Sequence, residues 1–118
     1  MTGDELARLL ADDAVTLLDV RSREEYEGEG GYGCDPRQGH IPGAIHVPWE
    51  ELVELGPGGG DALRAVIAES GGDPDRRLVA YCHSGQRSSF AVTALRAAGL
   101  DAENYDGSWH EWSRREPD

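Results

Sequence analysis

The sequence predicts an α/β domain in which a parallel sheet carries helices on both faces. Residues 78–81 form a short, unbroken apolar run, which is typical of a strand buried on both sides within a parallel sheet. Apolar residues at helical spacing follow this run, and strand-like and helix-like segments alternate along the chain. Such alternation implies right-handed crossovers between parallel strands.

Strand patterns and helix start signals define most of the expected elements. The expected strands are residues 15–19, a short piece within 41–47, residues 78–81 and residues 102–105. The Thr/Ser-x-x-Glu capping box predicts helix starts at Thr2, at Ser22 and, near the end of the chain, at Ser108. The expected helices cover the faces of the sheet.

Three further helices are expected in the middle of the chain. One starts at Pro48, and four of its apolar residues are expected to pack inward: Trp49, Leu52, Val53 and Leu55. Another is capped by Asp61 and directs three residues to the core: Leu63, Val66 and Ile67. The third covers residues 88–98 and ends before Gly99.

The length and charge of the chain limit what it can be. We expect the 118 residues to form one domain, residues 1–118. The formal net charge of -12 argues against nucleic acid and anionic membrane lipid as partners, since both need a basic surface. Because we find neither a membrane-spanning run nor a signal-peptide pattern, we expect a cytoplasmic location.

The chain has two cysteines, Cys34 and Cys82, which do not form a C-x-x-C pair, and its four histidines lack metal-ligand spacing. The sequence therefore predicts no structural zinc site. Cys34 lies in residues 28–39, a segment with five glycines that we expect to be a long surface loop. We interpret Cys34 as an exposed thiol without a role, with a resolving cysteine as the alternative.

Cys82 is the candidate nucleophile. It follows the predicted strand 78–81, and a short loop leads from it into the amino terminus of the next helix. Free N–H groups and the helix dipole stabilise a thiolate at such a position, and Arg87 adds a positive charge. The thiol pKa should therefore fall below its ordinary value of roughly 8.5. The alternative is that Cys82 is a small buried apolar side chain.

Residues 82–87, which read CHSGQR, resemble the C-x-x-x-x-R active-site loop of the rhodanese family of sulfurtransferases. Three further segments resemble family signatures, in the family's order: DVR at 19–21 with EY at 25–26, GHIPGA at 39–44, and YDGSW at 105–109. The last segment looks most like the catalytic domain of two-domain thiosulfate or 3-mercaptopyruvate sulfurtransferases. The resemblance therefore implies a rhodanese-like domain.

The resemblance also implies a mechanism. Thiosulfate or 3-mercaptopyruvate would give its outer sulfur to Cys82, and cyanide or a thiol would remove it from the resulting persulfide; a protein persulfide is a further partner to consider. No metal or cofactor is required. The residues that would form the substrate-binding loop are His83, Ser84, Gly85, Gln86, Arg87 and Ser88, with Ser88 also capping the helix. Asp19 would support this loop and Arg21 would face the substrate, unless the two form a purely structural ion pair.

Two departures leave the donor open, and two other functions remain as alternatives. Glu25 stands where thiosulfate-specific relatives tend to have a basic residue, and His83 is mostly neutral at pH 7. A cysteine-dependent phosphatase or arsenate reductase uses a similar loop, but one residue longer: C-x-x-x-x-x-R. A rhodanese-like binding module without chemistry is the other alternative, and the presence of Cys82 and Arg87 argues against it.

Overall fold

Four parallel strands form the central sheet of the computed structural model, which describes residues 1–115. The strands are β1 (Val15–Asp19), β2 (Ile45–His46), β3 (Arg77–Tyr81) and β4 (Ala102–Asn104), in the spatial order β2-β1-β3-β4. β1 and β3 pair over their whole length, so that Asp19 lies opposite Tyr81. The two central strands therefore end at the same rim of the sheet.

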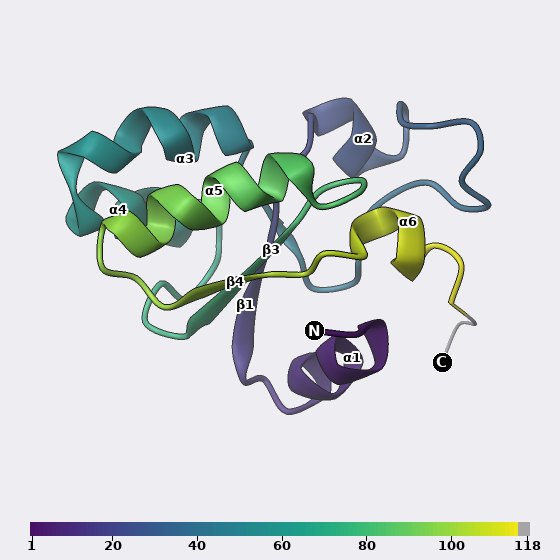
Figure 1. Ribbon diagram of the computed structural model, residues 1–118, viewed down its shortest axis with the longest axis horizontal. Coiled ribbons are helices and arrows are strands. Elements are labelled where there is room, and N and C mark those ends of the chain that lie inside the picture. Colours follow the sequence, from purple (N-terminus) through teal and green to yellow (C-terminus); the bar gives the residue numbers. More distant parts are fainter. Residues whose placement is uncertain (116–118) are drawn as a thin grey trace.

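Helices cover both faces of this sheet. They are α1 (Gly3–Ala11), α2 (Arg23–Glu27), α3 (Trp49–Leu55), α4 (Gly60–Glu69), α5 (Gln86–Ala97) and α6 (Ser108–Trp112), with a 3-10 turn, η1, at Gly56–Gly58. Figure 1 shows α3, α4 and α5 grouped on one side of the sheet, with α1 and α6 on the other. The predicted α/β class is confirmed. Within residues 1–115, no helix has the length and apolar character needed to span a bilayer.

The alternation of side chains along β3 divides the core into two clusters. Leu78 and Ala80, and Cys82 just beyond the strand, pack with the layer that contains α3, α4 and α5. Val79 and Tyr81 pack on the opposite face with residues of α1 and α6. All of these side chains are at most 1% exposed. β3 is thus buried on both faces, as the unbroken apolar run at residues 78–81 predicts.

Capping signals predict some helix starts correctly and others wrongly. The capping boxes at Thr2 and Ser22 are both present. The predicted Asp61 cap is wrong, because α4 begins at Gly60, two residues earlier than an Asp61 cap requires. Its N-cap is Gly59, which makes no side-chain bond. The predicted box at Ser108 is also wrong: this residue is the first of α6, and its hydroxyl group bonds to Tyr105 and Cys82 instead.

Two other details differ from the sequence expectations. Val53 is 40% exposed, so only the remaining apolar residues of α3 are wholly or partly buried. The helix after Cys82 begins at Gln86 rather than at residue 88. Gly85 adopts a left-handed backbone conformation with φ of 94°, which turns the chain directly into the helix. Ser88 therefore lies inside the first turn of α5 and does not cap it.

A buried ion pair joins the ends of the two central strands. Asp19 accepts hydrogen bonds from Arg21 Nε at 3.0 Å and Nη2 at 2.8 Å, and from the Tyr81 hydroxyl group at 2.6 Å. The side chains of Asp19 and Arg21 are 0% and 1% exposed. The arginine also donates to the Gly39 carbonyl and lies between the rings of Tyr81 and Trp109. The pair therefore connects the end of β1 to Tyr81 of β3, to the Gly39 carbonyl and to Trp109 of α6.

We expect Asp19→Asn to lower the free energy of unfolding by about 3 to 5 kcal/mol, because it leaves the Arg21 charge buried without its counterion. Urea denaturation followed by circular dichroism measures this change. Glu27→Gln, which breaks the exposed pair with Arg23, is the control and should cost less than about 1 kcal/mol. Equal losses in the two variants would contradict the structural role given to the pair.

Candidate active site

Cys82 lies where the carboxyl end of β3 meets the amino terminus of α5, and its side chain is 1% exposed. The backbone N–H of Gly85 donates to Cys82 Sγ at 3.1 Å, and the Ser88 hydroxyl group lies 3.4 Å from the same sulfur atom. We refer to residues 82–87 as the catalytic loop. Figure 1 shows the turn after β3 lying between α2 and α6. The sulfur atom is thus enclosed by hydrogen-bond donors.

These donors favour the thiolate. Burial is the largest single influence on the Cys82 thiol and opposes its ionisation. Hydrogen bonds from the Ser88 hydroxyl group and from the backbone N–H groups of Ser88, Ser84 and Gly85 act in the other direction. Together they outweigh burial, so the pKa of Cys82 lies below its ordinary value. Neutral donors, more than charged side chains, therefore stabilise the nucleophile.

Glycine is required at position 85. Its φ of 94° is rarely adopted by other residues, and a Cβ atom there would lie 2.7 Å from the Asp106 carbonyl oxygen. The Gly85 carbonyl accepts a hydrogen bond from Asn104 Nδ2 at 3.0 Å. The close approach of the two backbone segments, together with this bond, fixes the turn that directs the Gly85 N–H toward Cys82.

Hydrogen bonds from α6 hold the first two residues of the catalytic loop in place. The N–H groups of Trp109 and His110 donate to the carbonyls of Cys82 and His83, each at 2.9 Å. The Cys82 N–H donates to the Ser108 hydroxyl group at 3.1 Å, and that hydroxyl group donates to Tyr105 O. Sequence reasoning missed this role of Ser108. Its capping-box pattern pointed to the wrong partner, and we know of no other sequence signal for it.

Arg87 forms an ion pair with Glu25. Its guanidinium group makes two hydrogen bonds to the Glu25 carboxylate, at 2.8 and 3.0 Å. Burial opposes ionisation of Glu25, but Arg87 and Ser22 outweigh it and lower its pKa to about 2. Glu25 chiefly raises the pKa of Arg87, with a weaker contribution from Cys82. The positive charge expected from Arg87 is therefore paired with Glu25, and its effect on the thiolate stays a prediction.

The structure also locates the remaining predicted site residues. Asp19 supports the loop indirectly, through the hydroxyl group of Tyr81, the residue before Cys82. The expectation that Arg21 faces the substrate is not met, because its guanidinium group is buried against Asp19. This geometry matches the structural ion pair that the sequence left as an alternative.

The outer part of the catalytic loop is accessible. Ser84 and Gln86 are exposed, whereas His83 is half-buried. A pocket of about 530 Å³ opens beside Ser84 and is bounded on its other side by residues of α6 and the following turn, including His110 and Arg114. Small molecules can therefore approach the loop from the α6 side.

We expect iodoacetamide to alkylate Cys82 at a rate that reaches its plateau at a lower pH than for free cysteine, because the folded protein lowers the thiol pKa. The measurement uses the Cys34→Ser background in metal-free buffer. Ser88→Ala should shift the profile upward by about one pH unit, the effect of losing one hydrogen bond to a charged group. Ser89→Ala, at an exposed position in the same turn, should leave it unchanged. A wild-type profile like that of free cysteine would refute the proposed stabilisation.

Comparisons with known proteins identify the family. A family model described as "Rhodanese-like domain" matches residues 2–115. The chain is 44% identical over 104 residues to "Putative thiosulfate sulfurtransferase SseB" of Mycobacterium tuberculosis, covering 84% of this chain and 35% of that protein. It is 36% identical over 132 residues to "Sulfur carrier protein TtuD" of Thermus thermophilus, covering 92% and 46%.

Solved structures give the same result. The human single-domain sulfurtransferase TSTD1 matches with a TM-score of 0.74 and 31% identity, covering 99% of this chain and 96% of that one. A structure of wild-type EanB matches with a TM-score of 0.79 and 30% identity, covering 98% of this chain and 29% of that one. The chain spans about a third to a half of the length of the curated relatives named above. With a family match across residues 2–115 and an active-site loop of the family's form, the chain belongs to the rhodanese-like family.

Proposed function

We propose that this chain is a sulfurtransferase that carries a sulfane sulfur on Cys82 as a persulfide. The observation that carries the proposal is the convergence of hydrogen-bond donors on the Cys82 sulfur, which lowers its pKa. A thiolate at neutral pH is the reactive form of cysteine. The names of the relatives, a thiosulfate sulfurtransferase and a sulfur carrier protein, agree with this chemistry.

The reaction has two steps. The Cys82 thiolate attacks the outer sulfur of thiosulfate, the bond between the two donor sulfur atoms breaks, and its electron pair leaves with sulfite. With 3-mercaptopyruvate as donor, the carbon–sulfur bond breaks instead and pyruvate forms after protonation. Cyanide or a thiol then attacks the outer sulfur of the persulfide and leaves as thiocyanate or as a new persulfide. The N–H groups of the catalytic loop stabilise Cys82 as the leaving thiolate in this second step.

The geometry favours sulfur transfer over the two alternatives. Four residues separate Cys82 from Arg87, one fewer than in the phosphatase and arsenate reductase loop. The donors converge on the sulfur atom itself, and a tetrahedral oxyanion needs a wider cradle. A binding module without chemistry does not need hydrogen-bond donors directed at a cysteine sulfur to lower its pKa.

The test is the intact mass of the protein after incubation with thiosulfate or with 3-mercaptopyruvate. We expect a gain of one sulfur atom, which cyanide removes as thiocyanate. Cys34→Ser should behave like the wild type, and Cys82→Ser should neither gain sulfur nor form thiocyanate. A persulfide that persists in Cys82→Ser, or Cys82-dependent hydrolysis of p-nitrophenyl phosphate without sulfur transfer, would overturn the assignment.

The charges around the loop bear on the choice of donor. Arg87 is neutralised by Glu25, and Arg21 by Asp19. Arg114, beside the pocket at Ser84, pairs with Asp35. With a formal net charge of -12, the chain therefore offers little attraction to the thiosulfate dianion. The singly charged 3-mercaptopyruvate, or a persulfide, is the donor class that this charge arrangement supports.

We expect Glu25→Gln to raise kcat/KM for thiosulfate by about tenfold at low ionic strength, because it frees one positive charge at the loop. The effect on 3-mercaptopyruvate should be smaller, since that donor carries one charge instead of two. With its pKa of about 2, Glu25 is ionised throughout the neutral pH range, so the comparison does not depend on assay pH.

Glu24→Gln removes the same charge from an exposed neighbouring position and is the matched control. It should change neither value of kcat/KM by more than about twofold, because exposed charges are strongly screened. Equal gains in the two variants, or equal gains for the two donors, would show that charge pairing at Arg87 does not select the donor.

A further inference from the structure

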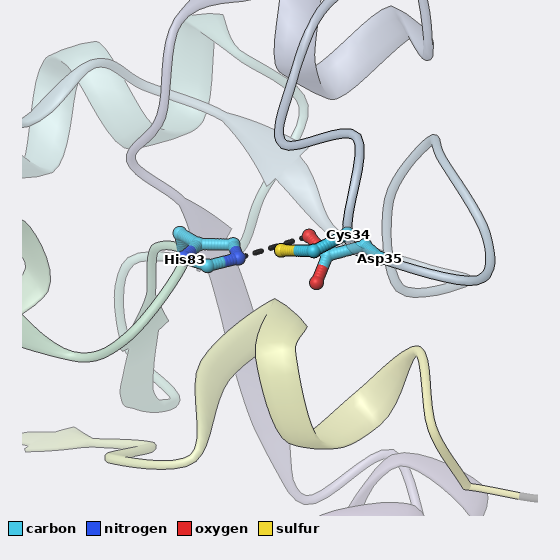
Figure 2. Close-up of side chains that lie close together, drawn as sticks. All are labelled: Cys34, Asp35 and His83. Atoms are coloured by element: carbon cyan, nitrogen blue, oxygen red, sulfur yellow. Dashed lines mark hydrogen bonds and ion pairs between the residues drawn. The ribbon is translucent and has the colours of Figure 1, made fainter.

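Three different metal-ligand atoms come together beside the catalytic loop. The Cys34 sulfur, a carboxylate oxygen of Asp35 and a ring nitrogen of His83 all lie within 4.8 Å of one another. Figure 2 shows the His83 ring directed toward Cys34 and Asp35. Asp35 and Cys34 belong to the glycine-rich segment 28–39, and His83 directly follows Cys82. We call these three residues the Cys-Asp-His cluster.

We propose that the Cys-Asp-His cluster is a binding site for a divalent transition metal ion of the zinc type. Thiolate, imidazole and carboxylate are the three ligand classes that Zn²⁺ takes in proteins. Harder ions such as Mg²⁺ and Ca²⁺ prefer oxygen ligands alone and do not suit a thiolate. The formal net charge of -12 also draws cations toward the chain. The donor set therefore selects the class of metal.

Contacts around the cluster hold two of the three ligands in place. Asp35 Oδ1 accepts a hydrogen bond from Arg114 at 2.8 Å, while Oδ2 lies 2.9 Å from His83 Nε2. One carboxylate oxygen is thus anchored by Arg114. The other shares a hydrogen bond with the imidazole, and a bound metal ion would replace the proton of that bond. The His83 ring stacks on Tyr32 with 3.8 Å between ring centroids. These two ligands need little rearrangement.

Cys34 is the exposed member of the cluster. Donor atoms around a tetrahedral zinc ion lie about 3.5 Å apart, and the three ligand atoms lie within 4.8 Å of one another, so the shifts needed are on the order of 1 Å. Cys34 is exposed, and rotation of its side chain is enough for such a shift. Three protein ligands, one of them the accessible Cys34 thiol, leave the fourth position to water. The site is thus of the open, exchangeable kind.

A metal ion here would connect the glycine-rich segment to the residue next to the nucleophile. The catalytic loop would then be restrained from the outside, which should slow persulfide formation on Cys82. Metal binding itself does not depend on the proposed sulfurtransferase activity. The two proposals can therefore fail separately, and binding is measured first.

The binding test uses Cys82→Ser, which leaves Cys34 as the only thiol of the chain. Anaerobic titration with Co²⁺ should give a thiolate-to-metal charge-transfer band in the near ultraviolet, at one ion per chain, and Zn²⁺ should remove it. Adding Cys34→Ser should abolish the band. Absence of the band in Cys82→Ser, or its survival without Cys34, would overturn the proposal.

Two histidines test the choice of ligands. In the Cys82→Ser background, His83→Gln should weaken Co²⁺ binding by about tenfold or more. His110→Gln is the matched control, because its ring nitrogen lies 4.0 Å from the other oxygen of Asp35, beyond hydrogen-bond distance. It should change the affinity by less than about threefold. Equal losses would overturn the ligand assignment. Circular dichroism confirms that each variant is folded.

The effect on sulfur transfer is tested with the Cys82-containing proteins. Zn²⁺ should inhibit persulfide formation in the wild type at a concentration about tenfold lower than in Cys34→Ser, where only direct binding to Cys82 remains. Equal sensitivity of the two proteins to Zn²⁺ would overturn the inhibitory role of the site.

Discussion

The buried pair of Asp19 and Arg21 holds together the rim of the sheet on which the rest of the site depends. The carboxylate receives hydrogen bonds from Arg21 and from Tyr81, and the Tyr81 hydroxyl group in turn accepts the N–H of Ile41. Arg21 also reaches the carbonyl of Gly39. A buried charge is tolerated only when such contacts are complete. The pair therefore fixes the strand ends and the glycine-rich segment together.

The protein lowers the pKa of the Cys82 thiol although its own charge is strongly negative. The groups that stabilise the Cys82 thiolate are backbone N–H groups and one hydroxyl group, which carry no net charge and need no counterion. Arg87, which the sequence offered for this task, and Arg21, which it offered as a substrate-side charge, each pair with a carboxylate. The ion pairs of Arg21 and Arg87 hold the strand ends and the loop in place, whereas the neutral hydrogen-bond donors lower the pKa of Cys82. Positioning of the site and stabilisation of the thiolate are thus carried out by different groups.

The two thiols of the chain have environments that suit different chemistry. Cys82 is buried at a helix amino terminus among hydrogen-bond donors, which favours a thiolate that attacks and leaves. Cys34 is exposed beside an imidazole and a carboxylate, which are typical metal ligands. His83 lies in both environments, because it follows Cys82 in the chain and points to Asp35. It is the link through which one site can influence the other.

Local patterns in the sequence determined the α/β class, the four strands and two capping boxes, because each depends on residues within a few positions. Only the tertiary structure decided which polar side chains meet. Glu25 and Arg87 are 62 positions apart in the sequence, and Asp35 and His83, which also pair, are 48 positions apart. Periodicity and capping carry no information about such distant partners. For this reason the roles expected of Arg21 and Ser108 had to be revised, and neither the Glu25–Arg87 pair nor the Cys-Asp-His cluster could be foreseen.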